Sequence, residues 1–148
     1  MKSIILLIFV FVGISMKAQV ATNTELNDST NIYFQSVEIL CNNLHNKTET
    51  LFVEQNNLTT NSLPSKIGGH EIKLIDITGL EKLIKKNKDV EIVRVIPLRV
   101  KSGEFFVNII YFSVKFEKRR IIFTNKGGYS VVFDYDSNTK YFTFKEIR

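Results

Sequence analysis

Apolar side chains recur at steps of three and four along residues 31–45, and polar side chains fill most positions between them. This spacing puts the apolar residues on one face of a helix. The residues of that face are Tyr33, Val37, Leu40, Cys41 and Leu44. A shorter pattern of the same kind predicts a second helix over residues 78–87, with lysines on its outer face. Both helices need an apolar surface to cover.

Most of the remaining chain has the β-branched and aromatic composition of strands. We expect strands over residues 48–55, 70–76, 90–100, 105–116, 129–135 and 140–147, and residues 119–124 are either a short strand or part of a bend. Turn signals lie at residues 101–104, 125–128 and 136–139. Strands joined by short turns pair antiparallel, because parallel pairing needs a crossover of about a dozen residues. The pattern predicts one α+β domain over residues 30–148, with an N-terminal helix packed on a curved antiparallel sheet and one short extra helix.

The strand predicted over residues 105–116 is apolar on both faces. One set of alternating positions holds Phe106, Ile110, Phe112, Val114 and Phe116. The other set holds Phe105, Val107, Ile109 and Tyr111. A strand with one solvated face does not need this pattern, and one helix covers only one face of a sheet. The sheet therefore curls on itself, or its second face lines a pocket or meets a partner. The candidate ligand-binding residues are Phe105, Val107, Ile109 and Tyr111.

Residues 1–18 have the features of a secretory signal peptide. The start is positively charged, residues 4–14 form an apolar run, and the small residue Ala18 precedes Gln19. The apolar run is shorter than the roughly 20 residues that cross a bilayer, although a signal-anchor helix stays an alternative. We expect cleavage near Ala18-Gln19, a flexible leader over residues 19–29, and a secreted or periplasmic protein with no transmembrane segment after signal removal.

Composition excludes several classes of chemistry. The chain of 148 residues has one cysteine and two histidines, which argues against a disulfide scaffold and against a zinc site built from those ligands. The phosphate-binding loop, dinucleotide fingerprint, nucleophile elbow and HExxH motif are all missing, so we expect no metal and no cofactor. The net charge of +5 falls to +3 when residues 1–18 and their two lysines are removed. This mild excess on an exported protein predicts no nucleic-acid partner.

A few side chains are candidates for catalysis, each with a structural explanation that we favour. His70, Asp76 and Tyr111 are the acid–base candidates, although His70 and Asp76 lie about 20 Å apart along one strand face. Cys41 has His45 one helical turn away, which is the spacing of a thiol–imidazole pair. A cysteine beside an apolar stripe is more typical of a core.

Charged and aromatic clusters give further candidates for binding. Asp134 and Asp136 share a strand face near a turn and are candidate ligands for Ca²⁺, but the spacing of an EF-hand is missing. An exposed strand edge that runs into a turn is the interpretation that we favour. Two basic clusters are typical of solvated faces, and they attract an acidic partner or anionic lipid only if folding brings them together. Their members are Lys82, Lys85, Lys86 and Lys88, and Lys115, Lys118, Arg119, Arg120 and Lys126. The last predicted hairpin, residues 129–147, is rich in aromatic residues that we expect to pack across the strands.

The predicted order of elements resembles the cystatin-like and NTF2-like folds, in which a helix lies across a curved antiparallel sheet. The chain is also similar to small exported Bacteroidetes proteins of uncharacterised function. The features that carry this likeness are the signal ending Lys17-Ala18-Gln19, the stretch 63–69 before Glu71, and Gly127-Gly128 ahead of a terminal hairpin. The resemblance implies no catalytic residues. The chain lacks the further N-terminal helices of NTF2-like enzymes and the Gln-x-Val-x-Gly hairpin of cystatins.

These observations favour an exported, non-catalytic binding domain whose sheet recognises a protein or a small ligand. A second copy of the chain, forming a homodimer through the sheet, is one such partner. One alternative is a small NTF2-like enzyme with an acid–base pocket. Another is a surface-associated protein that binds polyanions or lipids, which predicts binding that salt abolishes.

Overall fold

The computed structural model describes residues 30–44 and 50–148. The predicted signal peptide, the leader and His45 lie outside these residues. Strands hold 54% and helices 20% of the described chain, so the protein is an α+β fold dominated by its sheet. The helices are α1 (Ile32–Asn43) and α2 (Ile77–Asn87). The strands are β1 (Thr50–Glu54), β2 (Lys66–Ile67), β3 (His70–Ile75), β4 (Asp89–Val95), β5 (Arg99–Lys101), β6 (Glu104–Glu117), β7 (Arg120–Asp136) and β8 (Tyr141–Ile147).

All eight strands belong to one mixed sheet with the order β2-β3-β1-β4-β6-β7-β8, and β5 pairs with β6. Strand β1 is parallel to both β3 and β4, whereas every other pair is antiparallel. The expected cystatin-like or NTF2-like architecture, with an N-terminal helix on a curved antiparallel sheet, is therefore wrong. The error lies at two long connections. Residues 55–69 bring β3 back parallel to β1, and α2 connects β3 to β4 as a crossover, so that all three strands run the same way.

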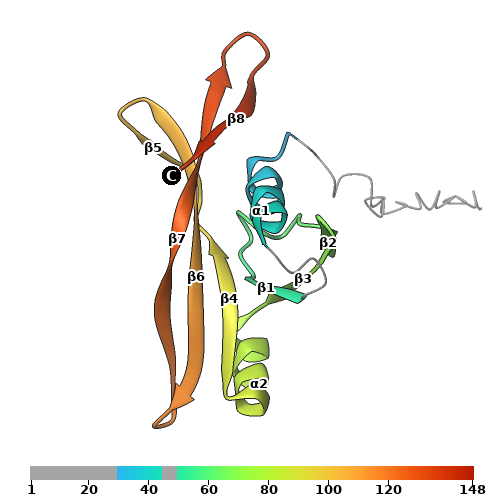
Figure 1. Cartoon of the computed structure of the whole chain (residues 1–148), viewed down its shortest axis with the longest axis vertical. Coiled ribbons are helices and arrows are strands. Elements are labelled where there is room, and N and C mark those ends of the chain that lie inside the picture. Colours follow the sequence, from blue (N-terminus) through green and yellow to red (C-terminus); the bar gives the residue numbers. More distant parts are fainter. Residues whose placement is uncertain (1–29, 45–49) are drawn as a thin grey trace, which may run out of the picture.

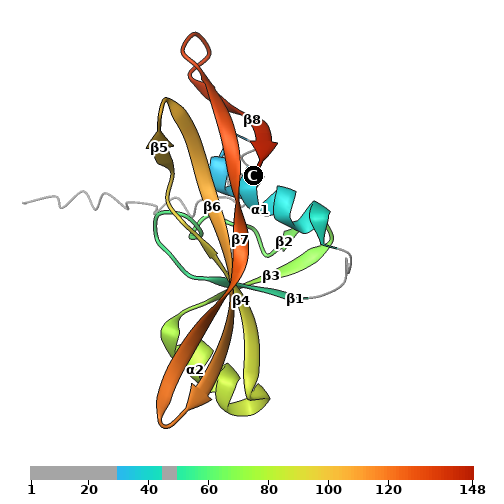
Figure 2. The same cartoon turned by 60° about the vertical axis from the view of Figure 1, so that its left-hand side comes forward.

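The two helices cover opposite faces of this sheet. Adjacent residues of a strand point to opposite faces, and Val93 belongs to the core beneath α1 while Ile92 belongs to the core beneath α2. Figure 1 shows β6 and β7 running the length of the molecule, with α1 beside the upper part and α2 beside the lower end. Figure 2 shows the twist of these long strands and again places α2 next to the turn between β6 and β7.

The second helix explains why β6 is apolar on both faces. Val107 and Ile109 are fully buried beneath α1. On the other face, Phe112 and Val114 pack in the core beneath α2. The sequence argument assumed that only one face of the strand has a helix to cover it, and α2 supplies the missing cover over the lower half.

The sequence pattern predicted a turn at the glycine pair of residues 127 and 128. In the structure, this pair lies inside β7. The register of β6 and β7 shifts between Ile110 and Phe112, so that Lys126 and Gly127 together oppose Tyr111. Gly127 adopts a φ of +102°, which a residue with a side chain rarely takes. These glycines therefore form a β-bulge in one strand of seventeen residues.

Side chains fix where both helices begin. The Asn31 Oδ1 atom accepts a hydrogen bond from the Tyr33 N–H at 2.9 Å, and the Asp76 carboxylate accepts one from the Gly79 N–H at 2.7 Å. Such caps satisfy backbone donors that have no partner in the first turn of a helix. In the part of the chain that the structure describes, neither helix is long and apolar enough to cross a bilayer.

Candidate functional site

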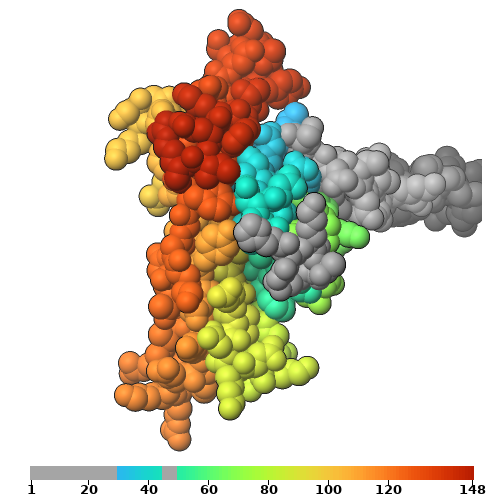
Figure 3. All heavy atoms as spheres, viewed as in Figure 1, coloured from blue at the N-terminus to red at the C-terminus, as the bar shows by residue number. Residues whose placement is uncertain are grey.

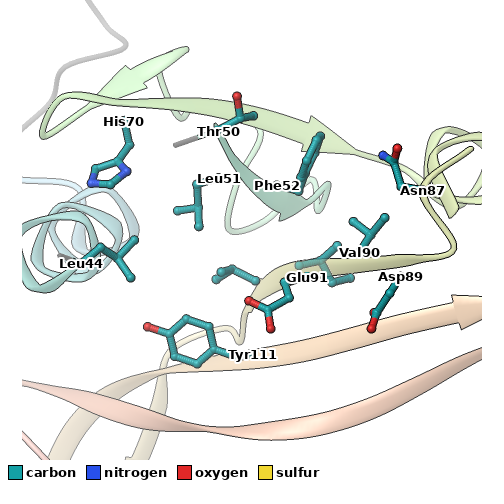
Figure 4. A pocket seen from close by; sticks show the side chains of 12 residues that line it. Leu44, Thr50, Leu51, Phe52, His70, Asn87, Asp89, Val90, Glu91 and Tyr111 are labelled. Carbon is teal, nitrogen blue, oxygen red and sulfur yellow. The ribbon is translucent and has the colours of Figure 1, made fainter. Parts of the chain in front are cut away.

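Strands β1 and β4 diverge and leave a cleft between them. All five residues of β1 pair with β3, but only Val53 of β1 pairs with a residue of β4, Val93. The cleft has a volume of about 370 Å³, which is within the range of small-molecule sites. Figure 4 shows the end of α1 and β3 on one side of it and β4 and β6 on the other.

Most of the cleft wall is apolar. Its apolar lining consists of Leu44, Leu51, Phe52, Val90, Ile92, Val93 and Tyr111. The polar lining consists of Thr50, His70, Asn87, Asp89 and Glu91. An apolar wall with a few polar groups is typical of sites that enclose the body of a small ligand and orient it through one or two hydrogen bonds.

The cleft contains two of the three predicted acid–base residues. His70, at the start of β3, is almost fully buried, and Tyr111 of β6 is half-buried on the opposite wall. Asp76 lies elsewhere, as the N-cap of α2. Of the four predicted ligand-binding residues, only Tyr111 lines the cleft, since Val107 and Ile109 are in the core. Phe105 packs against Tyr135 and Phe142, with ring centroids 5.9 and 5.3 Å away.

The thiol and phenol groups near the cleft are neutral at neutral pH. Burial raises the pKa of the Cys41 thiol to about 11, and Cys41 is fully buried on the inner face of α1. Burial also raises the pKa values of Tyr111 and of its neighbour Tyr129, whose rings are 6.4 Å apart. Desolvation disfavours the charged forms of these groups. Cys41 is therefore a core residue, and the predicted thiol–imidazole pair is not testable because His45 lies outside the described residues.

Two carboxylates of β4 border the cleft, and they differ in their partners. Asp89 accepts a hydrogen bond from the Ser113 hydroxyl at 2.8 Å and lies 3.4 Å from the Lys115 Nζ atom. The Ser113 bond, followed by the nearby lysine charges, lowers the pKa of Asp89. Glu91 forms no ion pair with any described residue, and its side chain points into the space between the strands (Figure 4). Glu91 is thus the charged group that the cleft offers to a ligand.

The other predicted candidates take structural positions. Asp134 pairs with Lys145 at 3.2 Å, and Asp136 accepts a hydrogen bond from the Asn138 N–H at 2.8 Å in the turn before β8. This backbone bond lowers the pKa of Asp136. Across residues 30–44 and 50–148, no three histidine, cysteine or acidic side chains gather in a group that holds a metal ion.

The sequence argument missed Glu91 and Leu51 as lining residues. Both residues lie in segments that the sequence argument assigned to strands. Alternation along a strand predicts the face on which a side chain lies, but it does not predict whether the neighbouring strand stays paired along its whole length. The divergence of β1 from β4 is a tertiary feature, and no local pattern in the chain encodes it.

Comparisons with known proteins give no family for this chain. No family model, no curated protein and no solved structure matches it. The resemblance to small exported Bacteroidetes proteins therefore stays a prediction.

Proposed function

We propose that this protein is an exported, non-catalytic binding module that takes a small amphiphilic amine into the cleft between β1 and β4. The observation that carries the proposal is an apolar-walled cleft with the unpaired Glu91 carboxylate directed into it. An apolar body buried against Leu51 and Tyr111 gains hydrophobic free energy of about 25 cal/mol per Å². A protonated amine on that body complements the charge of Glu91.

The charge states around the cleft favour binding over catalysis. A general base needs a group that accepts a proton near the working pH, and the raised pKa of Tyr111 keeps its phenol protonated. Asp76, the carboxylate of the predicted acid–base set, caps α2 through a hydrogen bond to Gly79. His70 is then the one other member of that set in the cleft, and it lies on the wall opposite Tyr111.

The variant Glu91→Gln tests the role of the carboxylate. It keeps the shape of the side chain and removes its charge, so phenethylamine is expected to bind about tenfold more weakly, in line with the loss of one charge-assisted contact. Binding of the uncharged analogue 2-phenylethanol is expected to stay unchanged. Isothermal titration calorimetry of both compounds against both proteins measures these differences.

Glu117→Gln is the matched control, because Glu117 is an exposed glutamate on β6 outside the cleft. It removes the same charge, and phenethylamine affinity is expected to stay at the wild-type value. Equal weakening by both substitutions would show that the amine responds only to overall charge. Failure of the wild-type protein to bind either compound would overturn the proposal.

A further inference from the structure

The positive charge of the described chain lies at one end. Residues 77–91 and 112–126, here called the basic end, contain nine lysines and arginines and four acidic residues. The rest of the described chain contains eight basic and eight acidic residues, so it is neutral overall. Both basic clusters seen in the sequence belong to this end. Folding has therefore brought together two segments that are more than twenty residues apart.

Contacts between α2 and β6 join the two clusters. The Lys85 Nζ atom of α2 lies 5.6 Å from the centroid of the Phe116 ring, near the end of β6. Figures 1 and 2 agree in placing α2 beside the turn between β6 and β7. The space-filling view in Figure 3 shows the two segments adjoining each other at the lower end of the molecule.

Most cations of the basic end have no acidic partner. Lys85 pairs with Glu81 at 2.6 Å, and Lys115 lies 3.4 Å from Asp89. The other seven are exposed and form no ion pair with any described residue: Lys82, Lys86, Lys88, Lys118, Arg119, Arg120 and Lys126. Their charges are available to an external anion.

Apolar side chains are exposed among these cations. Ile77 is 61% exposed, Ile122 41% and Phe116 38%. A groove of about 540 Å³ also runs between α2 and β3. Its apolar lining is Phe52, Leu74, Ile75 and Leu83. Two exposed lysines of the basic end, Lys82 and Lys86, also line it, together with Lys73, which pairs with Glu71 at 3.2 Å. An apolar lining with lysines beside it matches a molecule that has an acyl chain below an anionic head group.

We propose that the basic end docks on an anionic lipid bilayer. Lysines at a membrane surface attract anionic head groups, and each adds about fivefold to the binding constant. Seven of the nine cations are lysines, which present mobile point charges rather than the rigid fork with which arginine recognises one phosphate. The exposed apolar side chains between them favour a bilayer over a nucleic acid or an acidic polymer, because only the bilayer has an apolar layer beneath its anions. This inference does not depend on the ligand of the β1–β4 cleft.

Sedimentation with lipid vesicles tests the charge requirement. The protein is expected to bind vesicles that contain phosphatidylglycerol and not vesicles of phosphatidylcholine alone, and raising the salt concentration is expected to release it. The double variant Lys82→Gln, Lys86→Gln is expected to bind about 25-fold more weakly, from about fivefold per lysine. The control Lys66→Gln, Lys101→Gln removes the same charge from exposed sites outside the basic end. All variants keep the apolar residues 4–14, so any binding through that segment is common to them.

Fluorescence identifies which end touches the bilayer, because the chain has no tryptophan. Phe116→Trp places one at the basic end, and Phe144→Trp places one on β8, where Phe144 is 47% exposed. Phosphatidylglycerol vesicles are expected to shift the emission of Phe116→Trp to shorter wavelength and leave that of Phe144→Trp unchanged. The proposal is overturned by a shift at residue 144 alone, by equal weakening in both lysine pairs, or by binding to heparin without binding to vesicles.

Discussion

Gly128→Ala is expected to lower the free energy of unfolding by about 3 kcal/mol, the upper range for forcing an extra atom into closely packed surroundings. A Cβ atom at residue 128 overlaps the carbonyl oxygen of Ile109 and lies 3.0 Å from the Ile110 Cα atom. Both neighbours are backbone atoms of β6, which is held in the sheet by β4 on its other side. Because neither atom is the end of a flexible side chain, β6 and β7 must separate at the bulge. Chemical denaturation followed by circular dichroism measures the loss.

The adjacent glycine provides the control for this prediction. A Cβ atom at Gly127 meets no atom within 4 Å, and only its positive φ of +102° opposes a side chain. Gly127→Ala is therefore expected to cost about 1–2 kcal/mol, the cost of one residue in a left-handed conformation. A larger loss at residue 127 than at residue 128 would contradict the close approach of β7 to β6. It would favour the turn that the sequence pattern predicted.

Ile84→Ala is expected to cost about 3 kcal/mol, typical of removing a large aliphatic side chain from a core. Ile84 is 1% exposed and packs in the core beneath α2 with Leu80, Val90 and Val114. If α2 is the cover of the second sheet face, this substitution leaves a cavity against β4 and β6. Thermal and chemical unfolding of the variant measure the loss.

Ile77→Ala is the matched control, since it makes the same change at the first residue of α2, where the side chain is 61% exposed. Its free energy of unfolding is expected to stay within about 0.5 kcal/mol of the wild-type value. Equal effects at residues 77 and 84 would mean that α2 does not cover the sheet. The face of β6 that carries Phe112 and Val114 would then be open to a ligand or a partner.

The sequence predicted the elements better than their arrangement. Periodicity located both helices and most strands to within a few residues, because the buried face of a helix or strand requires apolar residues at the repeat of that element. The sequence pattern predicted one continuous strand over residues 90–100, whereas the structure has a break at Pro97 between β4 and β5. The Gly127-Gly128 pair has the composition of a turn, and only the neighbouring strand β6 shows that it forms a bulge. The direction of the strands was predicted wrongly at two connections. Residues 55–69 have the composition of a loop but join parallel strands, and α2 is long enough to be a crossover as well as a surface helix.

The candidate site was predictable only in part. Tyr111 and His70 were named from residue type, and the structure places both in the β1–β4 cleft. Glu91 has no local signal, because its importance comes from the divergence of β1 and from the absence of a cationic partner among the described residues. The two basic clusters were visible in the sequence, but their meeting depends on α2 packing against β6, which is a tertiary contact.

Backbone amide chemical shifts, recorded by NMR while phenethylamine is added, test the central claim most directly. The proposal of a cleft between β1 and β4 predicts that the largest shifts cluster at Leu51, Glu91 and Tyr111, on three different strands. Shifts confined to the aromatic hairpin of β7 and β8, or spread evenly over acidic residues, would contradict it.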